Sequence, residues 1–383
     1  MKRFLALTSL WLLFIFLAPI TGRSEAGGEE GMIPSKTTFS ADGRYVASMI
    51  DDGQVGVWAV DTHNLVCMVQ PPDNILDIDI DTSASKPQMR LQLYDGRIAV
   101  TDLAENAPLR WIVAGTHKMN FNEGKMLAYG WQVQISENYR IRYLVDLASN
   151  KEWPINSPVS TDHTVFSVLF SSDGQDVAVY TNIPIPFHNG YSIWRSHRGP
   201  EGFTKFIGLS RAWIIMDQVL MSKDGSRIVA IEARPKEAVK SWGRNARQTI
   251  TIDCLGKLPP WAGQSPGQSM ALSDDGELFA FGSIDDNVHI YSALTGKHVA
   301  EADLRKVLRA AGIFQPWLAN QPEHATEQYT NSISAVAISP NKKILCIQLG
   351  LQAILWNRVT GDITILPQPP YKTSPYRGPM TIG

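Results

Sequence analysis

A serine motif is the first candidate for chemistry in this chain. Gly263-Gln264-Ser265-Pro266-Gly267 has the Gly-x-Ser-x-Gly pattern of a nucleophilic serine. Such a serine is activated when the motif joins a strand to a helix through a strained turn. Here the motif follows Pro259-Pro260, and a proline comes directly after the serine. We therefore predict a connecting loop at this position, and no catalytic residue.

An alternating acidic stretch is the second candidate. Asp77, Asp79 and Asp81 alternate with Ile78 and Ile80, which places three carboxylates on one face of a strand. Carboxylate oxygens are ligands for Ca²⁺, but dedicated calcium loops also contain a glycine turn that is missing from this stretch. An exposed or water-lined acidic row is the favoured interpretation, and a bound Ca²⁺ remains the alternative.

Histidine and cysteine offer no obvious ligand set. The eight histidines show no metal-ligand spacing, and we expect His289 to be satisfied by its neighbours on a strand. Cys67, Cys254 and Cys346 lie far apart, so a disulfide scaffold or a cysteine-based zinc site is not expected, and buried thiols are the default. The sequence has no Cys-x-x-Cys-His and no glycine-rich phosphate loop. We predict neither a metal nor a cofactor.

Composition places these residues in an ordinary globular chain. The 383 residues are 44% hydrophobic and 19% charged, which is enough to form a sizeable core. With 35 Lys and Arg against 37 Asp and Glu, the formal net charge is -2. That balance argues against a protein whose main partner is nucleic acid.

The N-terminus has the pattern of an export signal. A basic start, Met1-Lys2-Arg3, precedes an apolar run from Phe4 to Ile20, and Ser24-Glu25-Ala26 fits a cleavage site. We predict a signal peptide over residues 1–26 and a periplasmic or secreted protein. An uncleaved N-terminal membrane anchor is the alternative, and it is the only membrane association expected.

One sequence pattern recurs along the rest of the chain. It consists of an alternating apolar stretch, a turn with Asp-Gly or its equivalent, and two more short strands. The clearest copy contains Ser40-Ala41-Asp42-Gly43 and ends at Trp58, while Gly174, Gly225 and Gly276 are spaced 51 residues apart. Repeats of this length indicate a propeller or a similar array. The copies are found at residues 39–58, 78–100, 119–145, 168–194, 219–230, 271–291 and 336–356.

Period-two alternation with such turns predicts antiparallel hairpins, and stacked sheets arranged in a ring would bury both faces of each sheet. The recurring Phe-Ser-x-Asp-Gly and the strands ending in Trp58, Trp194 and Trp356 resemble the WD40 family of β-propellers. The resemblance implies an all-β, seven-bladed propeller of four-stranded antiparallel blades. The expected domains are a signal peptide (1–26), a linker (27–34), the propeller (35–367, with an insertion at 302–331) and a Pro-rich tail (368–383).

Alternating strand direction predicts where the loops emerge. Turns between second and third strands and connections between blades share one face, while the other turns lie on the opposite face. Residues 184–190, 234–247 and 302–331 extend connections of the first kind, so we expect them to gather on one loop-rich face. The last of these also has apolar residues at helical spacing from Leu304 to Ala311, which predicts an amphipathic helix.

This loop-rich face is the predicted binding site for a protein partner. Its basic and aromatic character suggests an acidic protein, or a phosphorylated or sulfated ligand; a solvated surface hairpin is the alternative. The predicted partner-binding residues are Trp194, Arg195, His197, Arg198, Arg234, Lys236, Lys240, Trp242, Arg244 and Arg247.

The favoured function is that of a non-catalytic exported scaffold in the cell envelope. The alternative is an enzyme, or a cofactor- or small-ligand-binding propeller of the quinone or hydrolase type, that uses the central channel.

Overall fold

The chain divides into two units, Met1–Met32 and Ile33–Gly383, and all described residues belong to the second. The predicted signal peptide, the linker, the serine motif at 263–267, the helix expected beyond Leu304 and the Pro-rich tail lie outside the described residues. A computed structural model of the chain describes residues 36–50, 54–71, 75–83, 85–93, 98–105, 107–113, 118–119, 127–134, 139–146, 151–155, 165–185, 188–210, 213–234, 238–245, 248–252, 254, 269–283, 287–304, 333–349 and 352–367.

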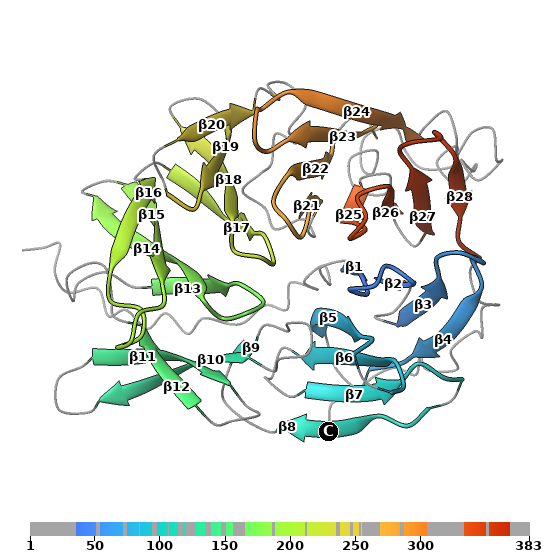
Figure 1. Ribbon diagram of the computed structural model, residues 1–383, viewed down its shortest axis with the longest axis horizontal. Helices are drawn as coiled ribbons and strands as arrows, with labels where there is room; N and C mark the ends of the chain where they lie inside the picture. The colour runs from blue at the N-terminus through green and yellow to red at the C-terminus, as the bar shows by residue number, and fades with distance from the viewer. Residues whose placement is uncertain are drawn as a thin grey trace, which may run out of the picture. The chain divides into compact units, whose positions relative to one another are not determined.

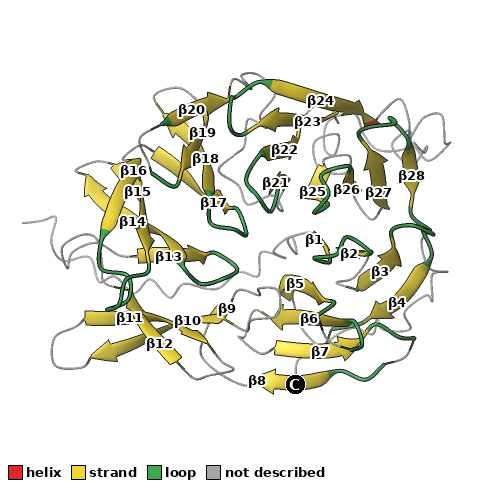
Figure 2. Ribbon diagram, viewed as in Figure 1, coloured by secondary structure: helices red, strands yellow, loops and turns green. Residues whose placement is uncertain are grey.

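Strands dominate the described residues, and they form seven four-stranded antiparallel sheets (Figures 1 and 2). Each sheet is built from four strands that are consecutive in the chain. The first three sheets contain β1 (Thr37–Phe39), β2 (Tyr45–Met49), β3 (Val55–Ala59) and β4 (Leu65–Val69); β5 (Ile75–Asp81), β6 (Gln88–Leu93), β7 (Ile98–Asp102) and β8 (Arg110–Val113); and β9 (Lys118–Met119), β10 (Leu127–Gln134), β11 (Tyr139–Asp146) and β12 (Lys151–Ile155).

The remaining four sheets follow the same order. They contain β13 (Val165–Phe170), β14 (Asp176–Ile185), β15 (His188–His197) and β16 (Phe206–Ser210); β17 (Trp213–Met221), β18 (Arg227–Arg234), β19 (Ala238–Gly243) and β20 (Thr249–Ile252); β21 (Met270–Leu272), β22 (Leu278–Gly282), β23 (Asn287–Ser292) and β24 (His298–Asp303); and β25 (Ile333–Ile338), β26 (Ile344–Leu349), β27 (Gln352–Asn357) and β28 (Ile363–Ile365).

The core lies between successive sheets. Six hydrophobic clusters each span two neighbouring sheets, including a cluster that joins the last sheet to the first. The first strands approach one another most directly, since β1 contacts β5 and β25 while β21 contacts β17 and β25. Figure 1 shows these first strands on the inner side and the fourth strands on the outer side. The first sheet and the fourth to seventh sheets each take part in two of these clusters, so both of their apolar faces are covered, as the expected stacking requires.

One hydrogen-bonded turn recurs at the first hairpin of five sheets. A serine hydroxyl donates to the Asp or Asn side chain two residues later, at 2.7 to 2.8 Å, and accepts from the backbone N–H five residues on. This network fixes the turn locally, because it satisfies the hairpin's polar groups with its own side chains. The pairs are Ser40–Asp42, Ser171–Asp173, Ser222–Asp224, Ser273–Asp275 and Ser339–Asn341.

The last copy of this turn has a lysine where the others have glycine. Lys342 has a φ of 60°, a conformation that is unfavourable for residues with a side chain. Its Nζ lies 2.6 Å from Asp275 Oδ2 and is also paired with Glu277. Lys342 therefore links the turn of the last sheet to that of the preceding sheet.

Within residues 36–367, as far as they are described, the last and first sheets exchange no strand at their junction. Thr37 Oγ1 lies 3.1 Å from Cys346 Sγ, Ser48 Oγ donates to Gln348 Oε1 at 3.1 Å, and the Trp58 indole donates to the carbonyl of Pro367 at 3.1 Å. Side chains close this junction, which we call the seam.

All three cysteines are buried thiols, as predicted. Burial raises the pKa of the Cys67 thiol to about 11 and that of the Cys346 thiol to about 12. Thiols with such values contain almost no thiolate near neutral pH and are therefore poor nucleophiles.

Candidate functional site

Strand direction gives the sheets two edges. The Asp-Gly edge carries the turns between first and second strands and between third and fourth strands. The hairpin edge carries the turns between second and third strands and the connections between sheets. We expected the predicted partner-binding residues to gather on the hairpin edge.

The structure divides these residues between the two edges. Residues 234–247 are not one loop, because β19 (Ala238–Gly243) occupies the middle of the segment. Arg234 ends β18 at the hairpin edge, and Lys236 follows it outside the described residues. Arg195, His197, Arg198 and Arg244 lie at the Asp-Gly edge, and Arg247 lies outside the described residues.

Two other predicted residues lie within sheets and not on a loop. Trp242 is fully buried in the cluster between the fourth and fifth sheets. Lys240 is in β19, where its Nζ donates to Thr251 Oγ1 at 2.7 Å. The placement of residues 234–247 on one loop was therefore wrong, because the alternation of Val239, Ser241 and Gly243 with Lys240 and Trp242 belongs to a strand. The partner-binding role itself stays a prediction.

Part of the predicted basic group converges on one carboxylate. Asp176 is fully buried at the start of β14, and Arg195 Nη2 donates to its Oδ1 at 3.0 Å. His197 Nδ1 lies 3.3 Å from Oδ1, and Arg244 Nη2 lies 3.3 Å from Oδ2. We call these four residues the Asp176 cluster. Arg195, His197 and Arg244, which the sequence analysis placed in one predicted site, therefore lie close together.

The Asp176 cluster joins the fourth sheet to the fifth. Arg195 also donates to the carbonyl of Gly225, and Arg244 donates to that of Asp224 at 2.9 Å. A Cβ on Gly225 would meet Asp176 and Ser171 at 2.9 Å, so the two sheets approach closely here. Burial lowers the pKa of Arg195, and its interactions with Asp176 oppose that effect. Arg195 thus acts within the fold, while His197 and Arg244 remain exposed.

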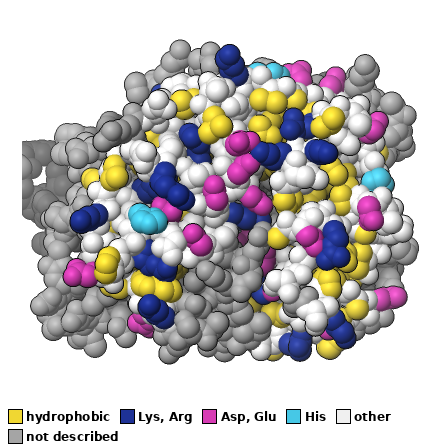
Figure 3. Space-filling model, viewed as in Figure 1, with side chains coloured by type: hydrophobic (Ala, Val, Ile, Leu, Met, Phe, Trp, Pro, Cys, Tyr) yellow, Lys and Arg dark blue, Asp and Glu magenta, His cyan; other side chains and the backbone are white. Residues whose placement is uncertain are grey.

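Beside this cluster, two basic side chains lie over one aromatic ring. The Arg198 guanidinium lies 4.1 Å from the ring centroid of Trp153, and Lys151 Nζ lies 5.6 Å from the same centroid. The loop after β15 reaches the third sheet, where Ile155 and Phe203 form an isolated bridge. Trp153 was not among the predicted residues, because its contact with Arg198 joins two different sheets. Figure 3 shows basic and acidic side chains interspersed over the face it draws, with no extended area of one sign.

The predicted acidic row is a buried ion-pair group. Asp79 and Asp81 are 9% and 6% exposed, and Arg90 of β6 lies directly opposite Asp79 in the strand register. Arg90 Nη1 is 3.5 Å from Asp79 Oδ2, and Arg90 Nη2 pairs with Asp81. The favoured interpretation as an exposed or water-lined row was wrong for these two residues, because the strand pairing brings an arginine between them. Only Asp77 is partly exposed.

Asp79 should make stability depend on pH. Burial raises its pKa to about 6 from 3.8, although Arg90 and Lys223 oppose the shift. An aspartate whose pKa is higher in the folded state favours folding most when protonated, and this contribution is lost as the pH rises through about 6.

We expect Asp79→Asn to be more stable than the unmodified protein at pH 7.5, by about 1–3 kcal/mol. The difference should vanish near pH 4, where Asp79 is itself protonated, as measured by urea unfolding at both pH values. Asp61→Asn, at an exposed turn, should show no such pH dependence. A less stable Asp79→Asn protein at pH 7.5 would contradict the assignment.

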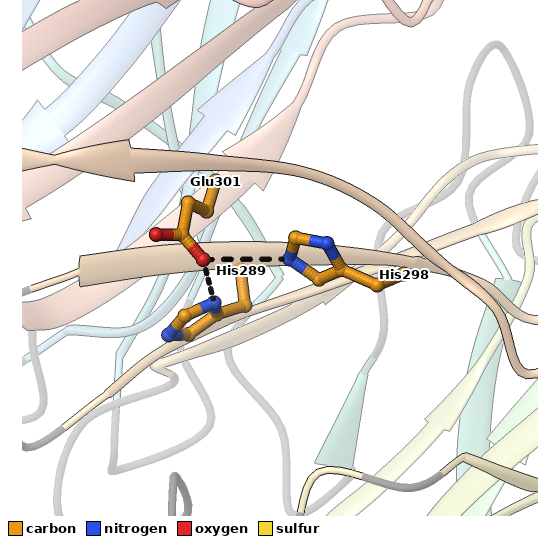
Figure 4. Close-up of side chains that lie close together, drawn as sticks. All are labelled: His289, His298 and Glu301. Atoms are coloured by element: carbon orange, nitrogen blue, oxygen red, sulfur yellow. Dashed lines mark ion pairs between the residues drawn. The ribbon is translucent and has the colours of Figure 1, made fainter.

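The sequence analysis missed one group of potential metal ligands. His289, His298 and Glu301 lie on β23 and β24, with one ligand atom of each within 4.8 Å of the others (Figure 4). Among the residues that the structure describes, these three form the group of His, Cys, Asp or Glu side chains that lie close enough together to hold one metal ion. Spacing along the chain did not reveal it, since His289 comes from a different strand.

No helix of the described residues is long and apolar enough to cross a bilayer. No protein family model matches the chain, and no curated protein matches it.

Solved structures show a similar fold at low sequence identity. The β-propeller domain of Myceliophteria thermophila Cps50 (Swd1) is 12% identical with a TM-score of 0.51, and the match covers 85% of this chain and 97% of that domain. Chaetomium thermophilum Raptor is 15% identical with a TM-score of 0.51, and the match covers 88% of this chain but only 28% of Raptor. The recurring Ser-x-Asp-Gly turns, the four-stranded sheets and these similarities together identify the fold as that of a WD40-like β-propeller.

Proposed function

We propose that this chain is an exported, non-catalytic scaffold that binds a protein partner at the hairpin edge of its third, fourth and fifth sheets. The length of three adjacent hairpins carries this proposal. The second strands β10, β14 and β18 have 8, 10 and 8 residues, whereas β2, β6, β22 and β26 have 5 or 6. Long hairpins on a rigid scaffold are typical of recognition surfaces.

The β14–β15 hairpin is the longest of the three. It is paired without interruption from Asp176↔His197 at the Asp-Gly edge to Ile185↔His188 at its tip. At about 3.3 Å per residue, four additional residues extend a strand by roughly 13 Å. Such a hairpin supplies both an extended surface and a defined position for its tip.

The residue types of these segments favour a protein ligand. Tyr139 and Trp213 begin β11 and β17, Trp131 lies within β10, and Arg140 and Arg234 accompany them. Aromatic residues and arginine are the types that contribute most to protein interfaces. The arginines also favour a partner with acidic side chains.

Photocrosslinking tests the location of the partner site. A photoreactive phenylalanine analogue at Phe187 is expected to capture one defined protein, which should be identified by mass spectrometry. The same group at Leu294, on a turn of the Asp-Gly edge, should not capture it. Replacing residues 182–191 with Asn-Gly shortens the β14–β15 hairpin and should abolish capture from a photoreactive group at Trp213, with the far-ultraviolet circular dichroism retained. Capture at Leu294, or no effect of the shortening, would contradict the proposal.

Export is supported by the basic and apolar N-terminal sequence. The mature protein is expected to begin at Gly27, which N-terminal sequencing of the protein from its native source would establish. A mature chain that retains Met1 would favour the membrane-anchored alternative.

A further inference from the structure

Three side chains of the sixth sheet point at one position. His289 Nδ1 lies 3.3 Å from Glu301 Oε2, and His298 Nε2 lies 3.7 Å from the same oxygen. Figure 4 shows both imidazoles directed at that oxygen from two different strands. Two imidazole nitrogens and a carboxylate oxygen are the donor set of His₂Glu zinc sites.

Strand register creates this arrangement. His289 and Glu301 are directly opposite in the β23–β24 pair, so their side chains share one face of the sheet. His298 and Glu301 are three residues apart and would point to opposite faces in a regular strand. A bulge skips Val299, so that His298 pairs with Tyr291 and lies on the same face as Glu301.

The bulge belongs to the repeat, but the ligands do not. Similar register shifts occur between the third and fourth strands of the first, second and fourth sheets. The residues that correspond to His298 there are Leu65, Trp111 and Gly208. The bulge between third and fourth strands thus occurs in several sheets. At the position of His298, the sixth sheet has a metal-binding side chain, and the first, second and fourth sheets do not.

Neighbouring rings hold the two imidazoles. His289 is 1% exposed, and its ring centroid lies 5.6 Å from that of Phe281. The rings of Tyr291 and His298 are nearly perpendicular, with centroids 5.1 Å apart. Side chains held by packing lose less conformational entropy when they bind an ion. The side chains of His298 and Glu301 are 42% and 46% exposed, which leaves a path from solvent.

We propose that His289 Nδ1, His298 Nε2 and the Glu301 carboxylate bind one zinc ion, with water as the fourth ligand. Zn–N and Zn–O bonds of about 2.1 Å in a tetrahedron place ligand atoms about 3.4 Å apart. The observed 3.3 and 3.7 Å are close to this value, and a small rotation of the exposed His298 side chain brings the third distance into range. The mixed nitrogen and oxygen donors favour Zn²⁺ over Ca²⁺ or Mg²⁺. This site is independent of the proposed partner surface.

Cobalt substitution tests the site on the whole mature chain. After removal of metals with a chelator, Co²⁺ is expected to bind at one ion per chain with visible d–d absorption, and one equivalent of Zn²⁺ should abolish that absorption.

Variants at the exposed ligands distinguish a metal site from a simple ion pair. His298→Gln and Glu301→Gln are expected to weaken Co²⁺ binding by at least about 100-fold, more than the loss of an outer-shell partner. His63→Asn is the control, since it removes an imidazole at a distant turn and Asn tolerates the positive φ of that position. Unchanged thermal unfolding without metal would show that the variants fold. Absent d–d absorption in the unmodified chain, or equal Co²⁺ affinity in His298→Gln, would overturn the proposal.

Discussion

Asp176→Ala is expected to lower the free energy of unfolding by about 3–5 kcal/mol, because it leaves the buried Arg195 guanidinium without its carboxylate. The Arg195 side chain is 2% exposed and Asp176 is fully buried, so water cannot replace the lost partner. The substitution also removes the ion pairs to His197 and Arg244, but these side chains are exposed and contribute less. Urea unfolding followed by tryptophan fluorescence measures the change.

Two comparisons test the cause of this loss. Asp173→Ala, three residues earlier, removes the hydrogen bonds that Asp173 accepts within its exposed turn and should cost about 1 kcal/mol. The double variant Asp176→Leu/Arg195→Met removes both buried charges and should recover much of the stability lost in Asp176→Ala. A double variant as unstable as the single one would show that the ion pair is not the cause.

Trp58→Ala is expected to cost about 3–5 kcal/mol, through the cavity left by a fully buried indole at the seam. Trp58 packs in the cluster shared by the first and last sheets, and its indole N–H donates to Pro367. Loss of the indole should weaken the contact between the first and last sheets before the contacts between other neighbouring sheets. Hydrogen exchange measured by mass spectrometry is therefore expected to rise first in β1 and β26.

Trp242 provides a matched control for the hydrogen bond of Trp58. Both indoles are 1% exposed, and each tryptophan is the next-to-last residue of the third strand of its sheet. Trp58→Phe removes ring volume together with the bond to Pro367, whereas Trp242→Phe removes ring volume within the fifth sheet's interface. Trp58→Phe should be the more destabilising by about 1 kcal/mol. Equal losses would mean that the Pro367 bond contributes nothing.

The sheets could be predicted because their determinants are local. Alternating residues and Ser-x-Asp-Gly turns specify each hairpin within about ten residues, and the turn network of Ser40, Ser171, Ser222, Ser273 and Ser339 now explains the recurrence in physical terms. Aligning the copies would also have revealed Asp176, since Tyr45, Leu278 and Ile344 stand at the same distance from their turn serines.

The site residues were harder to place because they depend on register and on contacts between sheets. A strand read as a loop moved Arg244 to the wrong edge and left Trp242 apparently exposed. The opposition of Asp79 and Arg90 is fixed by a pairing of two strands, and the convergence of His289, His298 and Glu301 requires a one-residue bulge. Neither can be derived from spacing along a single strand, because the relevant neighbours are in another segment.

The seam sets the order in which this molecule can be completed during synthesis. Thr37 and Cys346 are separated by 309 residues, so the first sheet cannot contact the last sheet until the last sheet has left the ribosome. Ring closure must therefore be a late, non-local step with a large loop entropy. Because side-chain packing and hydrogen bonds of side chains make the described contacts of the seam, a circular permutant with new ends at another junction would face the same closing reaction.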